Sequence, residues 1–202
     1  QDLQQKLQKE LGNDYDVFLG MRYSIPSLAS QLDKIATGNY KRILLIPLYP
    51  QYSDATTGTT LKAVQEWIKA HHMLKNIEVL THFYWDSHVT DCYVDNGKKI
   101  LDSFAPDHIL ISFHGLPQKM LSEGLGKGHC YQSESCCFAV SDKNIYCYRS
   151  QSLKTAKHIA DKLQLAPENY TTCFQSRLGR AEWIQPYTKD TIIKLAKEGK
   201  KR

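Results

Sequence analysis

Apolar residues alternate along the chain between short continuous runs and longer stretches with helical spacing. The continuous runs at 42–48 and 107–113 predict strands buried on both faces, because such runs leave no polar side for solvent. Helical spacing follows them at 57–70 and 153–163. Weaker patterns predict further strands at 16–21, 77–80 and 170–174, and further helices at 26–36, 89–104 and 189–199.

This alternation of strands and helices predicts the α/β fold class, with two Rossmann-like units whose parallel sheets are flanked by helices. A boundary near residues 82–86 gives a first unit at 1–83 and a second at 84–202. In open parallel sheets, ligands bind beyond the carboxyl ends of the strands. The residues that follow each strand are therefore the candidates for function.

The composition excludes several classes of protein. The net charge of +5 comes from dispersed cations, and there is no cluster of basic and aromatic residues typical of nucleic-acid binding. No run of eighteen apolar residues is present to span a membrane. Six cysteines are few for a secreted disulfide scaffold of 202 residues. We expect a cytoplasmic protein, with peripheral contact to an anionic membrane left open.

The segment after the first buried run, 47–60, combines prolines and tyrosines with a series of hydroxyl residues. Tyr52 and Ser53 could form a stiff wall with hydrogen-bond donors, suited to a flat ligand that carries carboxylates. Ser53 or Thr56 could instead be an ordinary helix N-cap.

The second buried run ends at His114, which Gly115 and Pro117 follow. A single histidine is more often structural, but a Gly-Leu-Pro turn after a strand leaves the imidazole projecting from the end of the sheet. An imidazole there can accept a proton near neutral pH or bind a transition metal. In the third segment, 174–187, Trp183 could be a core residue or a stacking platform.

An insert at 128–148 concentrates the thiols of the chain. Its four cysteines are Cys130, Cys136, Cys137 and Cys147. Four thiols match the ligand count of a [2Fe–2S] cluster or of a structural zinc ion, and uncoordinated thiols or a disulfide are the alternatives. We expect Cys92 and Cys173 to be buried as small apolar residues.

Several blocks together resemble the ferrochelatase family, in its order and spacing. They are residues 20–23, 50–53, 112–117, 175–179 and 182–187. The resemblance covers almost the whole chain apart from the insert. It implies an enzyme that inserts Fe²⁺ into protoporphyrin IX to form protohaem, with release of two protons.

The resemblance also implies residue roles. His114 would take the pyrrole protons, bind the incoming iron, or do both. The residues that would line the porphyrin cleft are Tyr52, Ser53 and Trp183 on one side and Arg22 and Tyr23 near the other wall. Some bacterial ferrochelatases carry a [2Fe–2S] cluster, and this likeness favours iron–sulfur over zinc at the cysteines.

The family pairs its histidine with a glutamate on a later segment, which these 202 residues do not reach. We therefore expect the sequence to be a fragment that also lacks the family's first strand. Two other functions stay open: a cobalt or sirohydrochlorin chelatase of the same superfamily, and a non-catalytic module that binds porphyrin or haem. The sequence leaves open protoporphyrin or coproporphyrin as substrate, and the oligomeric state.

Overall fold

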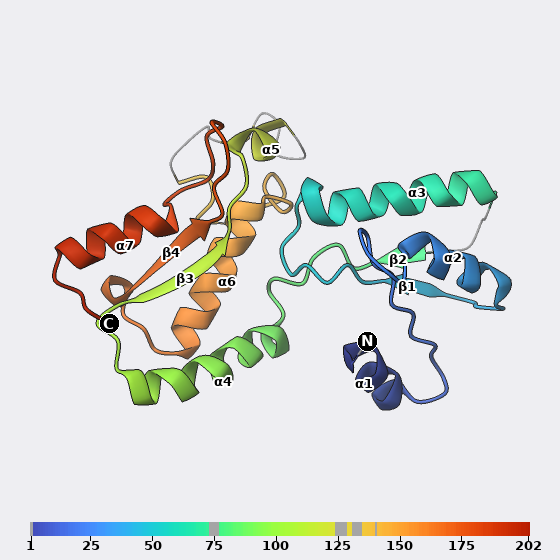
Figure 1. Ribbon diagram of the computed structural model, residues 1–202, viewed down its shortest axis with the longest axis horizontal. Helices are drawn as coiled ribbons and strands as arrows, with labels where there is room; N and C mark the ends of the chain where they lie inside the picture. The colour runs from blue at the N-terminus through green and yellow to red at the C-terminus, as the bar shows by residue number, and fades with distance from the viewer. Residues whose placement is uncertain (1, 73–76, 124–128, 131–134, 140) are drawn as a thin grey trace. The chain divides into compact units, whose positions relative to one another are not determined.

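A computed structural model describes residues 2–72, 77–123, 129–130, 135–139 and 141–202 of the chain. The chain divides into two compact units, whose elements are labelled in Figure 1. Unit 1 comprises residues 1–48 and 55–81, and unit 2 comprises residues 49–54 and 82–202. The segment 49–54 therefore follows the first strand of unit 1 in sequence but packs within unit 2.

Unit 1 contains one parallel pair of strands covered by helices. Its elements are α1 (Asp2–Leu11), α2 (Leu28–Thr37), β1 (Ile43–Leu45), α3 (Thr59–His71) and β2 (Ile77–Val79), and a π-helical turn η1 (Asp54–Gly58) leads into α3. Strand β1 pairs with β2 from Ile43–Ile77 to Leu45–Val79. The parallel pairing confirms the predicted α/β class for this unit.

The core of unit 1 lies between its helices and its strands. Leu32 of α2 and Val64 and Trp67 of α3 are buried together, and Leu45 and Ile77 pack against them. Apolar side chains three apart on α3 thus share the face that covers the sheet.

The prediction that residues 42–48 are buried on both faces is wrong for this strand. Leu44 and Leu48 are both 60% exposed. Only the face of β1 that carries Leu45 packs on the helices, among the residues that the structure describes. An apolar run therefore identified the strand but not the number of its covered faces.

The predicted strand at 16–21 is also wrong. This segment is extended, but its one ladder contact among the described residues is an isolated bridge between Met21 and Ser27. Side chains of α1 satisfy the backbone instead: Val17 N donates to Gln8 Oε1 at 2.8 Å, and Gln4 Nε2 donates to Val17 O at 2.7 Å. These bonds take the place of a neighbouring strand.

Unit 2 repeats the parallel arrangement with longer strands. Its elements are α4 (Ser87–Phe104), β3 (Ile109–His114), α5 (Gln118–Glu123), α6 (Tyr148–Lys162), a 3₁₀ turn η2 (Pro167–Asn169), β4 (Tyr170–Gln175) and α7 (Thr188–Lys197). Strands β3 and β4 pair in parallel from Ile109–Tyr170 to His114–Gln175, and in Figure 1 they lie between α6 and α7. The carboxyl ends of both strands therefore lie side by side, β3 ending at His114 and β4 at Gln175.

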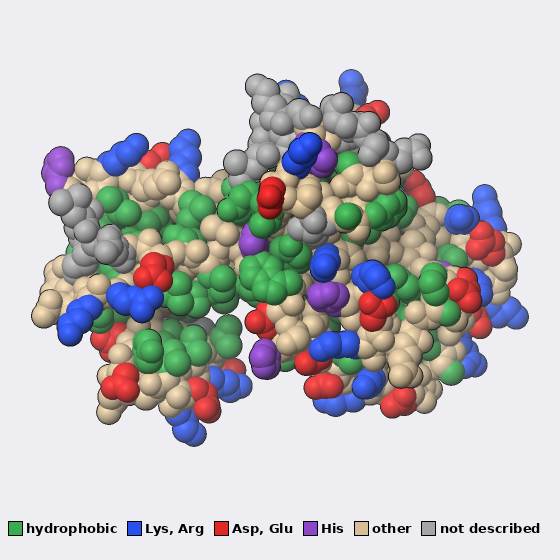
Figure 2. Space-filling model, turned by 180° about the vertical axis from the view of Figure 1, so that it is seen from behind, with side chains coloured by type: hydrophobic (Ala, Val, Ile, Leu, Met, Phe, Trp, Pro, Cys, Tyr) green, Lys and Arg blue, Asp and Glu red, His purple; other side chains and the backbone are tan. Residues whose placement is uncertain are grey.

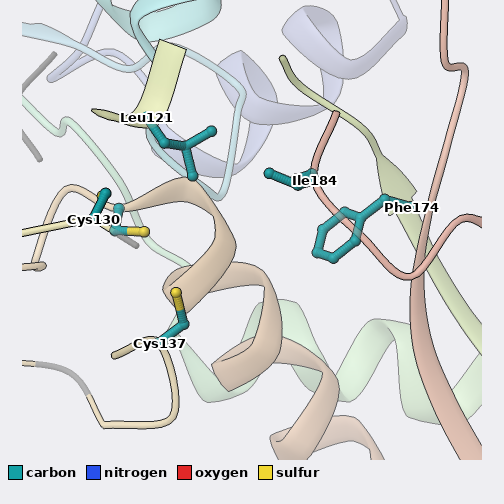
Figure 3. Close-up of a cluster of buried hydrophobic side chains, with 6 residues drawn as sticks. Leu121, Cys130, Cys137, Phe174 and Ile184 are labelled. Atoms are coloured by element: carbon teal, nitrogen blue, oxygen red, sulfur yellow. The ribbon is translucent and has the colours of Figure 1, made fainter. Parts of the chain in front are cut away.

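The core of unit 2 lies at this end of the sheet. Phe174 and Ile184 are almost completely buried and belong to one cluster with Leu121 and cysteines of the insert (Figure 3). Helix α6 begins at Tyr148, earlier than its apolar spacing predicted. The buried residues in its first two turns are polar, and apolar ones follow: Ser150, Gln151, Ser152 and Thr155, then Ala156 and Ala160.

On the face drawn in Figure 2, lysine and arginine side chains are interspersed with aspartate and glutamate and form no single basic field. Among the described helices, none combines the length and the apolar content that a membrane span requires.

Candidate active site

His114 is the last residue of β3, and its side chain is exposed. Gly115 follows it, and its N–H donates to Gln175 O at 2.7 Å. A Cβ at position 115 would lie 2.8 Å from that same oxygen, so the backbone of β4 excludes any side chain here. Glycine thus lets the chain turn immediately after His114 while staying bonded to β4.

The segment 182–187 crosses the turn after His114 and brings Trp183 to it. Ile184 N donates to Leu116 O at 2.9 Å, and Pro117 and Trp183 form an antiparallel bridge. The Trp183 ring would lie 3.2 Å from a Cβ at Gly115. The structure therefore brings together two residues that the sequence analysis took from separate blocks, His114 and Trp183.

Tyr52 and Ser53 also belong to unit 2 and are almost completely buried, with exposed fractions of 8% and 6%. The Tyr52 hydroxyl donates to Asp54 Oδ1 at 2.9 Å, and its ring meets Tyr146 edge-on at 5.2 Å between centroids. Burial and the bond to Asp54 raise the pKa of Tyr52 far above its ordinary value. The phenol is therefore a permanent hydrogen-bond donor at neutral pH.

The loop that carries Tyr52 is attached to the rest of unit 2 at three further points. Gln51 Nε2 donates to Thr155 Oγ1 at 3.0 Å, and Phe83 N donates to Pro50 O at 2.9 Å. Tyr52 N donates to Gln151 Oε1 at 2.6 Å. Two of these three bonds depend on side chains of α6.

Arg22 and Tyr23 belong to unit 1, whereas the other predicted site residues belong to unit 2. Tyr23 is 78% exposed, and the Arg22 guanidinium lies 4.9 Å from the centroid of its ring. A cation over an aromatic face orients both side chains without burying either. Their predicted place beside a porphyrin stays a prediction.

The four cysteines of the insert lie near the start of α6. Cys130, Cys137 and Cys147 are buried in one cluster that Cys136 contacts, and the Sγ atoms of Cys136 and Cys137 are 3.5 Å apart. Figure 3 shows the sulfur atoms of Cys130 and Cys137 pointing toward one another. No group of three or more histidine, cysteine or acidic side chains is arranged to hold a metal ion in the described part of the chain.

The thiols differ in their tendency to ionise. A hydrogen bond from Cys137 and the backbone N–H groups of Arg149 and Ser150 lower the pKa of Cys147, although burial opposes them. Helix N-termini commonly stabilise thiolates in this way. The same bond to Cys147, together with burial, raises the pKa of Cys137.

The other two cysteines differ from each other. Cys173 is completely buried, as expected, but Cys92 is exposed on α4, so the prediction that it is buried is wrong. No disulfide bond links any two of the six cysteines, all of which lie among the described residues.

Sequence reasoning missed two residues that support Tyr52. Gln151 is completely buried, although a glutamine in a helix ordinarily indicates the solvent face. His82 is 9% exposed and packs against Tyr146, and burial lowers its pKa. No local pattern marks either residue as a support of Tyr52, because the contacts that make the link, Gln151 to Tyr52 and His82 to Tyr146, join segments far apart in sequence.

Comparison with known proteins identifies the family. The family model described as Ferrochelatase matches residues 1–202 of the chain. The chain belongs to the ferrochelatase family. Curated ferrochelatases similar to it include that of Coxiella burnetii, 37% identical over 201 residues. Those of Bdellovibrio bacteriovorus and Pseudomonas fluorescens are 38% identical over 195 residues and 37% identical over 205 residues.

These matches cover nearly the whole chain but only part of each relative. The Coxiella match takes in 99% of the chain and 55% of that ferrochelatase, and the Bdellovibrio match 96% and 57%. The Pseudomonas match takes in 99% and 60%. The chain thus spans a little over half the length of the curated ferrochelatases it matches. The predicted family is confirmed, and a cobalt or sirohydrochlorin chelatase is not favoured.

Proposed function

We propose that the protein inserts ferrous iron into protoporphyrin IX and thereby forms protohaem. The observation that carries this proposal is the position of His114. It is exposed at the end of β3, and the next residue, Gly115, packs closely against the backbone of β4 and the Trp183 ring. Membership of the ferrochelatase family supports the same reaction.

The chemistry of metal insertion requires what this position offers. Two pyrrole N–H protons must leave the macrocycle as the metal enters, so a proton acceptor is needed beside the ring plane. The imidazole of His114 is that acceptor, and Trp183 beside it presents an aromatic surface to a planar ligand. The ring of Tyr52 is the part that would contact the porphyrin, since its hydroxyl proton is already donated to Asp54 Oδ1.

The test is zinc insertion, because zinc protoporphyrin is fluorescent and zinc needs no anaerobic handling. In the full-length protein, His114→Ala should lower turnover at least a hundredfold while protoporphyrin binding stays within about threefold. His88→Ala, which changes an imidazole with a side chain 93% exposed, is the matched control and should keep full turnover. Porphyrin binding without turnover in the unmodified protein would replace the proposal by a non-catalytic porphyrin-binding module.

A second proposal concerns the insert. We infer that its four cysteines ligate a [2Fe–2S] cluster: Cys130, Cys136, Cys137 and Cys147. Four thiols of one short segment that gather near a helix N-terminus suit this cluster in donor type and number. When bound, the cluster would supply a crosslink between the two ends of the insert.

Analysis of iron, acid-labile sulfide and zinc in protein purified without oxygen tests this inference. Two irons and two sulfides per chain, with absorption between about 400 and 600 nm, are expected. One zinc ion and no sulfide would indicate the structural-zinc alternative, and a metal-free, colourless protein would indicate free thiols. Cys92→Ser is the control, since that exposed thiol lies outside the insert.

We propose the cytoplasm as the location of the protein, with peripheral contact to an anionic membrane. Dispersed cations support weak electrostatic contact of this kind. Flotation with vesicles that contain phosphatidylserine, compared with neutral vesicles, tests the contact.

A further inference from the structure

The first two turns of helix α6 contact two of the candidate site residues of unit 2, His114 and Tyr52. The Tyr148 hydroxyl donates to the backbone carbonyl of His114 at 2.9 Å. One turn later, Gln151 Oε1 accepts from Tyr52 N at 2.6 Å. Residues 148 and 151 are neighbours on one helix face, so a single rigid element joins the end of β3 to the loop that carries Tyr52.

The burial of Gln151 indicates a specific role. Its side chain is completely buried, and a buried amide destabilises the fold unless both of its polar atoms are hydrogen-bonded. Both are bonded here: Oε1 accepts from Tyr52 N, and Nε2 donates to Ile145 O. Leucine or methionine would fill the same space without that requirement, so the amide holds two backbone segments at a defined separation.

The contact between Tyr148 and His114 is of a different kind. The hydroxyl reaches the His114 carbonyl, while the next N–H, that of Gly115, is bonded to Gln175 O. The peptide group that joins His114 to Gly115 is therefore held at both of its polar atoms. This restricts rotation of the backbone from which the imidazole projects.

We propose that Gln151 and Tyr148 are positioning residues, Gln151 for Tyr52 and Tyr148 for His114. The inference rests on the proposed porphyrin chemistry. Neither residue touches the substrate. Gln151 acts on porphyrin affinity, because it sets the place of a residue that contacts the ring. Tyr148 acts on turnover, because it sets the direction of the proton acceptor.

Two substitutions separate these roles in the full-length protein. Gln151→Met keeps the length and volume of the side chain but removes both hydrogen bonds. We expect it to weaken protoporphyrin binding about tenfold, with turnover at saturating porphyrin within about twofold. Tyr148→Phe removes only the hydroxyl, and we expect it to lower turnover about fivefold with affinity within about twofold. Binding is measured by tryptophan quenching without metal, and turnover by zinc insertion.

Ser152→Ala is the matched control. Ser152 is as completely buried as Gln151, but its hydroxyl donates to Tyr148 O within the same helix. It should leave both affinity and turnover within about twofold. If Ser152→Ala weakens binding as much as Gln151→Met, the effect is general to α6 and the positioning role is wrong.

Gln151→Glu is a rescue variant and also serves if Gln151→Met does not fold. A protonated glutamic acid can accept from Tyr52 N and donate to Ile145 O, as the amide does. Its porphyrin affinity should approach that of the unmodified protein as the pH is lowered from 8 to 6, measured relative to the unmodified protein at each pH. Affinity that stays defective throughout would overturn the role of Gln151.

The inference and the proposed function fail differently. A full-length protein that binds no protoporphyrin removes the proposed function before any variant is made, and the inference with it. A protein that binds and metallates porphyrin, but whose Gln151→Met variant binds normally, loses only the inference about Gln151. Normal turnover in Tyr148→Phe likewise overturns the role of Tyr148 alone.

Discussion

The segments that follow β1 and β3 are held in different ways. After β3, the turn beside His114 is fixed by backbone hydrogen bonds, from Gly115 N to Gln175 O and from Ile184 N to Leu116 O. After β1, the loop 49–54 is held largely by side chains of α6. Backbone bonds form whatever the side chains are, so most substitutions should leave the His114 turn in place. The Tyr52 loop depends on particular residues.

The largest effect should come from Gly115, where the His114 turn depends on the absence of a side chain. Gly115→Ala places a Cβ 2.8 Å from Gln175 O, a backbone atom that cannot rotate away. We expect a loss of about 3 kcal/mol in the free energy of unfolding, the upper end for overpacking, and loss of zinc insertion. Denaturation in urea measures the first quantity.

Gly97→Ala is the control for this prediction. A Cβ at Gly97 would meet only Leu163 Cδ1, at 3.7 Å, and alanine favours a helix over glycine. This variant should be at least as stable as the unmodified protein. A normally stable Gly115→Ala variant would show that the His114 turn is not held by backbone approach.

The next largest effect concerns the part of the insert that precedes α6. Asn144 is 3% exposed, and its side chain bonds to Cys136 O, Ala139 O and Ser141 N. Asn144→Ala leaves these groups without their partner, so we expect a loss of about 2 kcal/mol. Lys143→Ala, an exposed neighbour, should change stability little. An Asn144→Ala variant as stable as Lys143→Ala would mean that Asn144 does not support the insert.

A smaller effect is expected at the support of the Tyr52 loop. Thr155→Val replaces a buried hydroxyl that accepts from Gln51 Nε2 at 3.0 Å and contacts Tyr84 O at 3.2 Å. We expect a loss of about 1 kcal/mol and weaker porphyrin binding, with the thiols of the insert unaffected. Thr155→Ser keeps the hydroxyl and should restore binding. Failure of serine to do so would assign the effect to packing.

The smallest effect is a dependence on pH. Burial lowers the pKa of His82, so the folded protein binds its proton less readily than the unfolded chain does. The stability that neutral His82 contributes is complete above about pH 6.5 and is lost as the pH falls through its lowered folded pKa. His82→Phe should therefore lose less free energy of unfolding between pH 7.5 and 5.5. His88→Gln, at an exposed position, should follow the unmodified protein.

The sequence predicted strands β1 to β4 and most helices of both units, though not α5, because apolar periodicity reflects a local requirement for burial. It also placed His114 at the end of a strand, and the structure confirms that position, whereas the role of His114 stays a prediction. The prediction of a strand at 16–21 failed because glutamine side chains of α1 took the place of a strand partner. The prediction that β1 is buried on both faces failed, because an apolar run does not indicate how many faces of a strand are covered.

The supports of the site could not have been predicted from one sequence. Gln151 and Tyr148 precede the apolar stretch that marked α6, and their partners, Tyr52 and His114, lie 99 and 34 residues away. A glutamine at such a position has the same local pattern whether it is solvated or buried. Only tertiary contacts distinguish the two cases.

The buried polar side chains in the first two turns of α6 limit where residues can be inserted or deleted. Apolar contacts have little directionality, so a helix held by them tolerates small rotations. Deleting one residue between 148 and 155 would turn the rest of the helix by about 100° and separate the side chains beyond the deletion from partners outside the helix, such as Thr155 from Gln51. Insertions and deletions in this unit should therefore be accommodated in the loops outside residues 148–155, as the position of the cysteine insert just before α6 illustrates.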